Sequence, residues 1–159
     1  MDVLIAIESP LSDDMRAMIG DLDAVLADLT PPEHCYHMSV EEMAGADTTV
    51  FTARDGDGAL LACGALRRHG AGTDRIGEVK RMFTRPRAQG HGLAGRILGC
   101  IEALARDEGI ARLVLETGDR HHAAWRVYER AGFTRCGPVL DYPDTRFSVF
   151  YEKLLTGEA

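Results

Sequence analysis

The sequence lacks the features that would place the chain in a membrane or in an oxidising compartment. No apolar run approaches the ~20 residues that a helix needs to span a bilayer. The first eight residues lack the basic start and the cleavage site of a signal peptide. Cysteine is scarce, and no two cysteines are spaced as Cys-x-x-Cys. We therefore expect a cytoplasmic protein without a membrane partner, in which four thiols are free and mostly buried: Cys35, Cys63, Cys100 and Cys136.

The chain also has few basic side chains for its size. Its 18 lysines and arginines face 25 aspartates and glutamates, so the net charge is −7. Because phosphate neutralisation needs a basic surface, this balance argues against nucleic acid as a partner and is compatible with a cationic small molecule. No internal repeat or long linker divides the 159 residues, of which 45% are hydrophobic. We therefore expect one domain spanning residues 1–159.

Apolar spacing and turn residues predict the order of the secondary-structure elements. A helix should begin at Ser12-Asp13-Asp14 and end at Thr30-Pro31-Pro32, and Ser39 should cap a short turn of helix. One further helix should follow the glycine-rich segment 89–95, and another should cover about 123–131. The predicted strands are 2–8, 48–54, 59–67, 76–84, 112–117, 133–136 and 147–154. The expected fold class is α/β (α+β), with a mixed, largely antiparallel central sheet flanked by helices.

The most informative stretch of the sequence runs from Lys80 to Gly95, and it ends in the glycine-rich segment Gln89-Gly90-His91-Gly92-Leu93-Ala94-Gly95. It joins a predicted strand to an amphipathic helix, whose first turn offers unpaired N–H groups and the positive end of the helix dipole. Small residues there let the oxygens of a phosphate approach those amides closely. A flexible turn is the plainer alternative. A P-loop fits poorly because no Gly-Lys-Ser/Thr follows, and a dinucleotide fold fits poorly because the preceding strands form a meander.

Two spaced motifs resemble those of the GCN5-related N-acetyltransferase (GNAT) family. The first, at the strand-to-helix junction, is Gln89-x-x-Gly92-x-Ala94. The second, about one strand and one helix downstream, is Ala124-x-x-x-Tyr128-x-x-x-Gly132-Phe133. The resemblance covers roughly residues 48–154. It implies the acyl-CoA N-acyltransferase fold, N-acetyltransferase activity and acetyl-CoA as the donor substrate.

The same resemblance implies a path for the donor along the chain. Backbone groups of Met82, Phe83 and Thr84 should bind the pantetheine arm where two neighbouring strands splay apart. The residues that should surround the pyrophosphate are Gln89, Gly90, His91, Gly92, Leu93, Ala94 and Gly95. Ala124 and Tyr128 should also contact the donor. His121 occupies the place of an asparagine that contacts the donor in many relatives, so it could bond the donor or cap the helix.

Acyl transfer from a thioester to an amine needs a base, a donor for the developing oxyanion and an acid for the thiolate. Tyr128 matches the family tyrosine that serves as the acid, and a core tyrosine is the alternative. Glu78 lies eleven residues before Gln89, a placement that resembles that of the base glutamate in the histone-acetylating branch of the family, so it is the expected base; an exposed glutamate at a strand start is the alternative. Glu116 is a second carboxylate expected at the cleft, where it would act through water or hold a cationic group.

The acceptor is less well defined by the sequence. Tyr36 and His37 lie in a segment that should form a wall of the acceptor pocket. Arg67 and Arg81 could bind a substrate carboxylate, which would make the acceptor amino-acid-like, or they could be surface strand charges. The expected acceptor is a small-molecule amine; the alternatives are a protein lysine or N-terminus, or a non-catalytic acyl-CoA sensor. No metal is expected, and the resemblance leaves a homodimer open.

Overall fold

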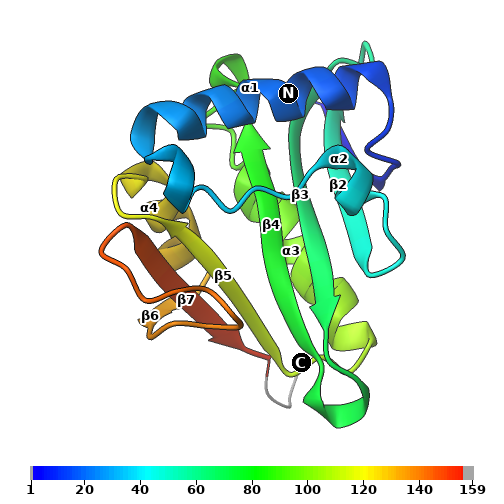
Figure 1. The fold of residues 1–159 in the computed structure, drawn as a ribbon. Coiled ribbons are helices and arrows are strands. Elements are labelled where there is room, and N and C mark those ends of the chain that lie inside the picture. The colour runs from blue at the N-terminus through cyan, green and yellow to red at the C-terminus, as the bar shows by residue number, and fades with distance from the viewer. Residues whose placement is uncertain (1, 156–159) are drawn as a thin grey trace.

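The computed structural model describes residues 2–155 of the chain as a seven-stranded sheet with helices on both faces (Figure 1). The sheet order is β1-β2-β3-β4-β5-β7-β6, and every neighbouring pair is antiparallel except β4 with β5. The strands are β1 Val3–Ile7, β2 Thr48–Asp55, β3 Leu60–His69, β4 Ile76–Thr84, β5 Arg112–Gly118, β6 Thr134–Cys136 and β7 Ser148–Leu154. The helices are α1 Asp13–Leu29, α2 Val40–Met43, α3 Leu93–Asp107 and α4 His122–Arg130, and short 3-10 turns cover Pro32–His34, Gly72–Asp74 and Pro86–Ala88. The predicted fold class is confirmed.

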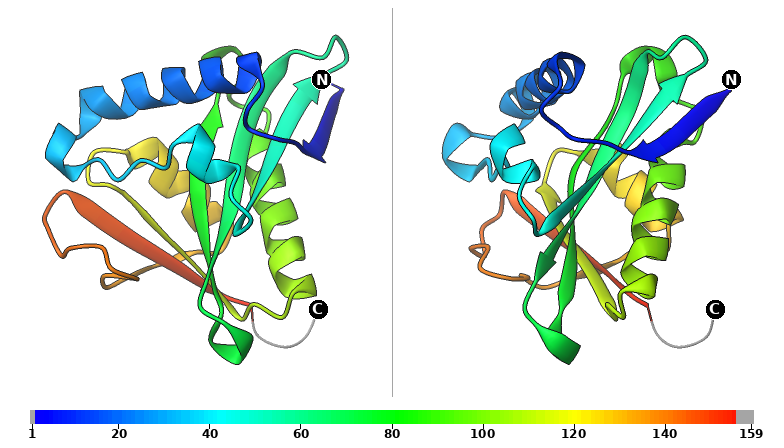
Figure 2. Two further views of the ribbon diagram at one scale, coloured as in Figure 1. Left: turned by 45° about the vertical axis from the view of Figure 1, so that its right-hand side comes forward. Right: turned by 90° about the vertical axis from the view of Figure 1, so that its right-hand side faces the viewer.

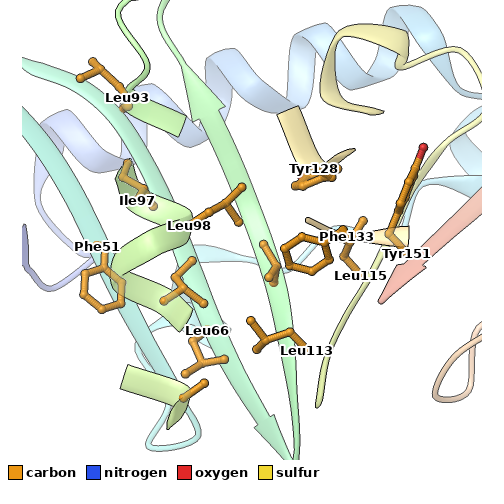
Figure 3. Packing of buried hydrophobic residues seen from close by; sticks show 14 of the residues in the cluster. Phe51, Leu66, Leu93, Ile97, Leu98, Leu113, Leu115, Tyr128, Phe133 and Tyr151 are labelled. Carbon is orange, nitrogen blue, oxygen red and sulfur yellow. The ribbon is translucent and has the colours of Figure 1, made fainter. Parts of the chain in front are cut away.

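The helices form two layers that enclose the sheet (Figure 2). On one face, α1 and α2 pack on β2 and β3 through a core that includes Met15, Met18, Ile19, Leu22 and Met43. On the other face, α3 and α4 pack on a second core, where side chains of α3 meet those of the sheet (Figure 3). That core includes Leu93, Ile97, Leu98, Ile101, Leu66, Leu113, Leu115, Tyr128 and Phe133.

Local sequence explains where α1 and α2 begin. Ser12 precedes α1, and its side chain accepts a hydrogen bond from the amide of Met15 at 3.4 Å. Ser39 precedes α2 and forms a capping box with Glu42, in which each side chain bonds the other residue's amide. The helix α1 ends before Pro31, whose ring cannot continue a helix. The expected Ser12 and Ser39 starts are therefore confirmed.

Strand β4 contains an irregularity that changes the direction of its side chains. Arg81 has a φ of 55°, in the left-handed region, and the β3–β4 register shifts between Cys63 and Ala65. As a result Val79 and Met82, three residues apart, both face the core on the α3 side of the sheet. Strict alternation would have placed them on opposite faces.

The two halves of the sheet meet only briefly. The parallel strands β4 and β5 pair at Gly77 with Leu113 and at Glu78 with Val114, and beyond these positions they diverge (Figure 1). Residues of β4 that follow Glu78 therefore have no strand partner on that side. The expectation of mostly buried thiols is wrong, because only Cys63 is fully buried while the other three cysteines are half-buried.

Candidate active site

A cavity of about 130 Å³ lies where β4 and β5 part. Its lining comes from both faces of the sheet, because α1 and the segment after it lie on one face and α4 on the other (Figure 2). The cavity therefore passes through the opening between the strands. It is lined by Leu22, Leu26, Thr30, His34, Cys35, Tyr36, His37, Val79, Lys80, Arg81, Met82, Glu116, Thr117, Gly118, His121, Ala124 and Tyr128.

Tyr128 reaches the cavity from α4. Its side chain is 8% exposed and packs edge-on against Phe133, with ring centroids 6.0 Å apart (Figure 3). No residue in the described range 2–155 forms a hydrogen bond with its hydroxyl. Burial, with Glu116 nearby, raises the pKa of the phenol above its ordinary value, so the group stays protonated at neutral pH. The hydroxyl is therefore available as a donor to a molecule in the cavity.

Glu116 brings a carboxylate to the cavity from β5. Its Oε2 accepts a hydrogen bond of 2.8 Å from the hydroxyl of Ser148 on β7. Burial raises the pKa of Glu116, against the opposing effect of the Ser148 hydrogen bond and of the charge on Lys80. The structure thus brings Glu116 and Tyr128 to the same cavity.

Glu78 is buried, at 2% exposure, but it does not line the cavity. One carboxylate oxygen lies 2.8 Å from Nε2 of His69, and the other accepts a hydrogen bond from the hydroxyl of Tyr142. Lys80 stands between this carboxylate and the cavity, with its Nζ 3.5 Å from Glu78 and 2.8 Å from the Tyr142 hydroxyl. The alternative of an exposed glutamate is excluded. The role of Glu78 as the base stays a prediction, and its carboxylate would have to act through Lys80.

The two arginines that were expected at the acceptor lie in different surroundings. Arg67 lies outside the cavity lining and contacts Asp47, with Nε 3.2 Å from Oδ2. Arg81 lines the cavity, is almost fully buried, and pairs through Nη2 with Asp23 of α1. The same oxygen of Asp23 lies 3.2 Å from Nδ1 of His37, which also lines the cavity.

His121 occupies the N-cap position of α4 but does not cap the helix with its side chain. Its Nε2 instead lies 3.2 Å from the hydroxyl of Thr30, at the end of α1. Burial lowers the pKa of this imidazole, which favours its neutral form. The contact joins α4 to α1 across the mouth of the cavity, and Ala124 lies one turn further along the helix.

The glycine-rich segment 89–95 follows the end of β4. Gly90 and Gly92 have φ values of 84° and 73°, which only glycine adopts without strain, and Gly92 is the N-cap of α3. The side chain of Gln89 donates to the carbonyl of Thr84 at 3.4 Å and so ties the segment to β4. Among the residues that the structure describes, no hydrogen bond uses the amides of 90–95, and a Cβ on Gly90, Gly92 or Gly95 would meet no atom within 4 Å.

Sequence reasoning missed several residues of the site. Lys80 follows Glu78 by two positions, so alternation along β4 could have placed it on the same face. Thr30, Leu22 and Leu26 belong to the last turns of α1, and nothing in their sequence pattern indicates a cavity. Tyr142, which bonds Glu78 and Lys80, lies in the loop before β7, and no motif marks it.

Within residues 2–155, no three histidine, cysteine, aspartate or glutamate side chains cluster as they would around a metal ion. Over the same range, no helix is both long enough and apolar enough to cross a membrane.

Comparison with known proteins identifies relatives over nearly the whole chain. The sequence model of the Acetyltransferase (GNAT) family matches residues 21–133. The chain is 38% identical over 154 residues to the IAA acetyltransferase of Azospirillum brasilense, covering 97% of this chain and 99% of the relative. It is 36% identical over 129 residues to the uncharacterized N-acetyltransferase YsnE of Bacillus subtilis, covering 80% of this chain and 83% of the relative. The crystal structure of an acyl-CoA N-acyltransferase from Klebsiella pneumoniae superposes with a TM-score of 0.79 at 28% identity, covering 97% and 98%.

Proposed function

The chain belongs to the acetyltransferase (GNAT) family, and we propose that it moves an acetyl group from acetyl-CoA to a primary amine of a small molecule. The observation that carries the proposal is the cavity that passes between β4 and β5, lined on one face by Tyr128 and on the other by residues of α1 and the segment 34–37. A donor and an acceptor can enter such a cavity from opposite faces and meet inside it. This arrangement supports direct attack in a ternary complex.

The donor would lie along β4 and the helix that follows it. Beyond Glu78 the edge of β4 that faces β5 has no strand partner, so backbone groups of 82–84 can bond an extended pantetheine arm. The unpaired amides of 90–95 and the N-terminus of α3 then supply donors and a positive dipole for the pyrophosphate. The open space around Gly90, Gly92 and Gly95 lets phosphate oxygens approach.

The chemistry needs a carbon–nitrogen bond to form, and a carbon–sulfur bond and a nitrogen–hydrogen bond to break. The amine nitrogen attacks the thioester carbonyl carbon, the carbon–sulfur bond breaks, and the nitrogen loses one proton. Tyr128 would give a proton or a hydrogen bond to the departing sulfur. Its hydroxyl is protonated at neutral pH and has no hydrogen-bond partner among the described residues. Glu116 is the carboxylate within the cavity and would orient the cationic amine, while Glu78 would act only through Lys80.

An amine screen tests this function. The protein is mixed with acetyl-CoA and each of a panel of small amines, amino acids and lysine peptides, and the release of CoA thiol is followed with a thiol reagent. IAA belongs in the panel because a relative is named for acetylating it. Release that depends on a small amine supports the proposal. Release with lysine peptides alone would shift the acceptor to a protein, and acetyl-CoA binding without release on any acceptor would indicate a sensor.

A further inference from the structure

Three histidines line the cavity, and their surroundings differ. His34 stacks on Phe147, with ring centroids 4.4 Å apart, and its Nδ1 is buried without a partner in the described chain. His121 directs Nε2 toward the Thr30 hydroxyl. Among the carboxylates of residues 2–155, one lies against a ring nitrogen of His37 alone of the three, since Nδ1 of His37 is 3.2 Å from Oδ1 of Asp23.

This contact leaves the second nitrogen of His37 available. No residue within 2–155 forms a hydrogen bond with Nε2, and this atom is not among the buried polar atoms that lack a partner. The contact lacks the geometry of a hydrogen bond, but the negative charge of Asp23 beside Nδ1 favours the tautomer that carries its proton there, which leaves a lone pair on Nε2. His37 thus combines a place in the cavity lining with a free ring nitrogen that can accept a proton.

The charges around His37 support its neutral form. Burial lowers the pKa of the imidazole, and the positive charges of Arg81 and Lys80 on β4 lower it further, while Asp23 on α1 opposes them. The ring is therefore unprotonated at neutral pH, as a base must be before it accepts a proton. Asp23 itself is held by Arg81, whose Nη2 pairs with the same carboxylate oxygen.

The two carboxylates expected as bases are engaged by other side chains. Glu78 lies outside the cavity, and both of its oxygens are engaged by His69 and Tyr142. Glu116 lies inside the cavity and on the same face of the sheet as the segment after α1, because Leu113 and Leu115 face the opposite core, but its Oε2 accepts a hydrogen bond from Ser148. His37 comes from the segment after α1, where the acceptor would enter.

We propose that His37, oriented by Asp23, is the general base that removes a proton from the acceptor amine as it attacks the thioester. The inference rests on the proposed function and names a residue of the same site. As the nitrogen–carbon bond forms, the nitrogen–hydrogen bond breaks and its proton passes to Nε2. The carbon–sulfur bond breaks, and the sulfur takes a proton from Tyr128. Solvent then returns the imidazolium proton to the tyrosinate, so both groups regain their starting forms.

The first test compares His37→Gln, Asp23→Asn and the exposed α1 control Asp28→Asn. His37→Gln should lower kcat about 100-fold or more, with unchanged affinity for acetyl-CoA, because general base catalysis contributes about 10²–10⁴-fold. The acid limb, which is the fall of kcat/KM at low pH as the base becomes protonated, should disappear in this variant. Asp23→Asn should move the limb to lower pH, because the charge that opposes loss of the proton is gone, and Asp28→Asn should match wild type.

Two further variants separate a base from a wall residue. His37→Ala should regain activity when imidazole is added, whereas Glu116→Gln should keep the acid limb. If His37 merely lined the pocket, its replacement would raise the KM for the acceptor and leave kcat unchanged, which would overturn the inference. Loss of the acid limb in Glu116→Gln instead of His37→Gln would also overturn it. Failure of the wild-type protein to release thiol with any acceptor would overturn the proposed function and this inference together.

Discussion

Gly92 offers a direct test of the proposed pyrophosphate site, because the same helix carries a matched glycine at its other end. Gly92 precedes α3 with a φ of 73°, Gly109 follows α3 with a φ of 77°, and a Cβ at either position would meet no heavy atom within 4 Å. A non-glycine residue in this conformation costs about 1–2 kcal/mol. Gly92→Glu and Gly109→Glu should therefore both lower the free energy of unfolding, by an amount that corresponds to roughly 2–8 °C in Tm, and Gly109→Glu should lower it more because its carboxylate lies at the negative end of the α3 dipole.

Affinity for acetyl-CoA should separate the two variants. Only Gly92→Glu places a carboxylate beside the proposed pyrophosphate and at the positive end of the α3 dipole. Two like unit charges about 5 Å apart repel by about 1 kcal/mol in water and by about 3 kcal/mol at an effective dielectric constant of 20. With one pyrophosphate charge at that distance, the expected loss of affinity is roughly 5- to 150-fold.

Calorimetric titration with acetyl-CoA measures this loss, and urea unfolding measures the stability of each variant. The loss for Gly92→Glu should shrink as salt is raised, because mobile ions screen exposed charges. Gly109→Glu should bind acetyl-CoA as wild type does. Wild-type affinity in Gly92→Glu, or an equal loss in Gly109→Glu, would refute the assignment of the segment 89–95 to the pyrophosphate.

Three further predictions concern the catalytic acid, the packing of β4 and the acid stability of α1. Tyr128→Phe should lower kcat by about 10²-fold while acetyl-CoA affinity stays the same, and an unchanged kcat would remove the hydroxyl from the chemistry. Gly64→Ala should lower the free energy of unfolding by about 1–3 kcal/mol, since its Cβ would clash with Sδ of Met82; Met82→Ala in the same chain should recover part of this loss in urea titrations. Hydrogen bonding to Arg54 lowers the pKa of Asp14 from 3.8 to about 2. The ionised carboxylate therefore stabilises the fold fully above pH 3.8, and this stabilisation is lost as the pH falls toward 2. Urea unfolding of Asp14→Asn and wild type should therefore differ at pH 5 and converge near pH 2, and a difference that persists there would contradict this origin.

The order and type of the elements could be predicted because strong local signals bracket them. The strand expected at 76–84 has the bounds of β4, with a glycine-rich turn before it and Pro86 after it. The helix expected after Ser12 likewise begins at Asp13 and stops before the two prolines. Capping side chains and ring geometry act over a few residues, so they are visible in the sequence itself.

The direction of side chains along β4 could not be predicted in the same way. A non-glycine residue with a φ of 55°, Arg81, shifts the register, and nothing in its residue type announces that conformation. Alternation from Glu78 predicts the side of Lys80 correctly, but it predicts the wrong face for Met82, because the irregularity lies between them. The bulge forms where β4 pairs with β3, and this pairing is a tertiary contact that local sequence does not reveal.

The sequence does not rank the candidate bases, for a related reason. Three carboxylates lie in or near the site, and each has a different partner: Glu78 has His69 and Tyr142, Glu116 has Ser148, and Asp23 has Arg81 with His37. The chemical type of a carboxylate is the same in each case, so only the partner decides whether it can take up a proton or orient a neighbour. Asp23 and His37 are separated in the chain by the last turns of α1 and the turn at Pro32–His34. The fold brings them into contact, and Arg81 pairs with the same oxygen of Asp23. The protonation chemistry of the site is therefore set by contacts between α1, β4 and the segment after α1, which no local motif encodes.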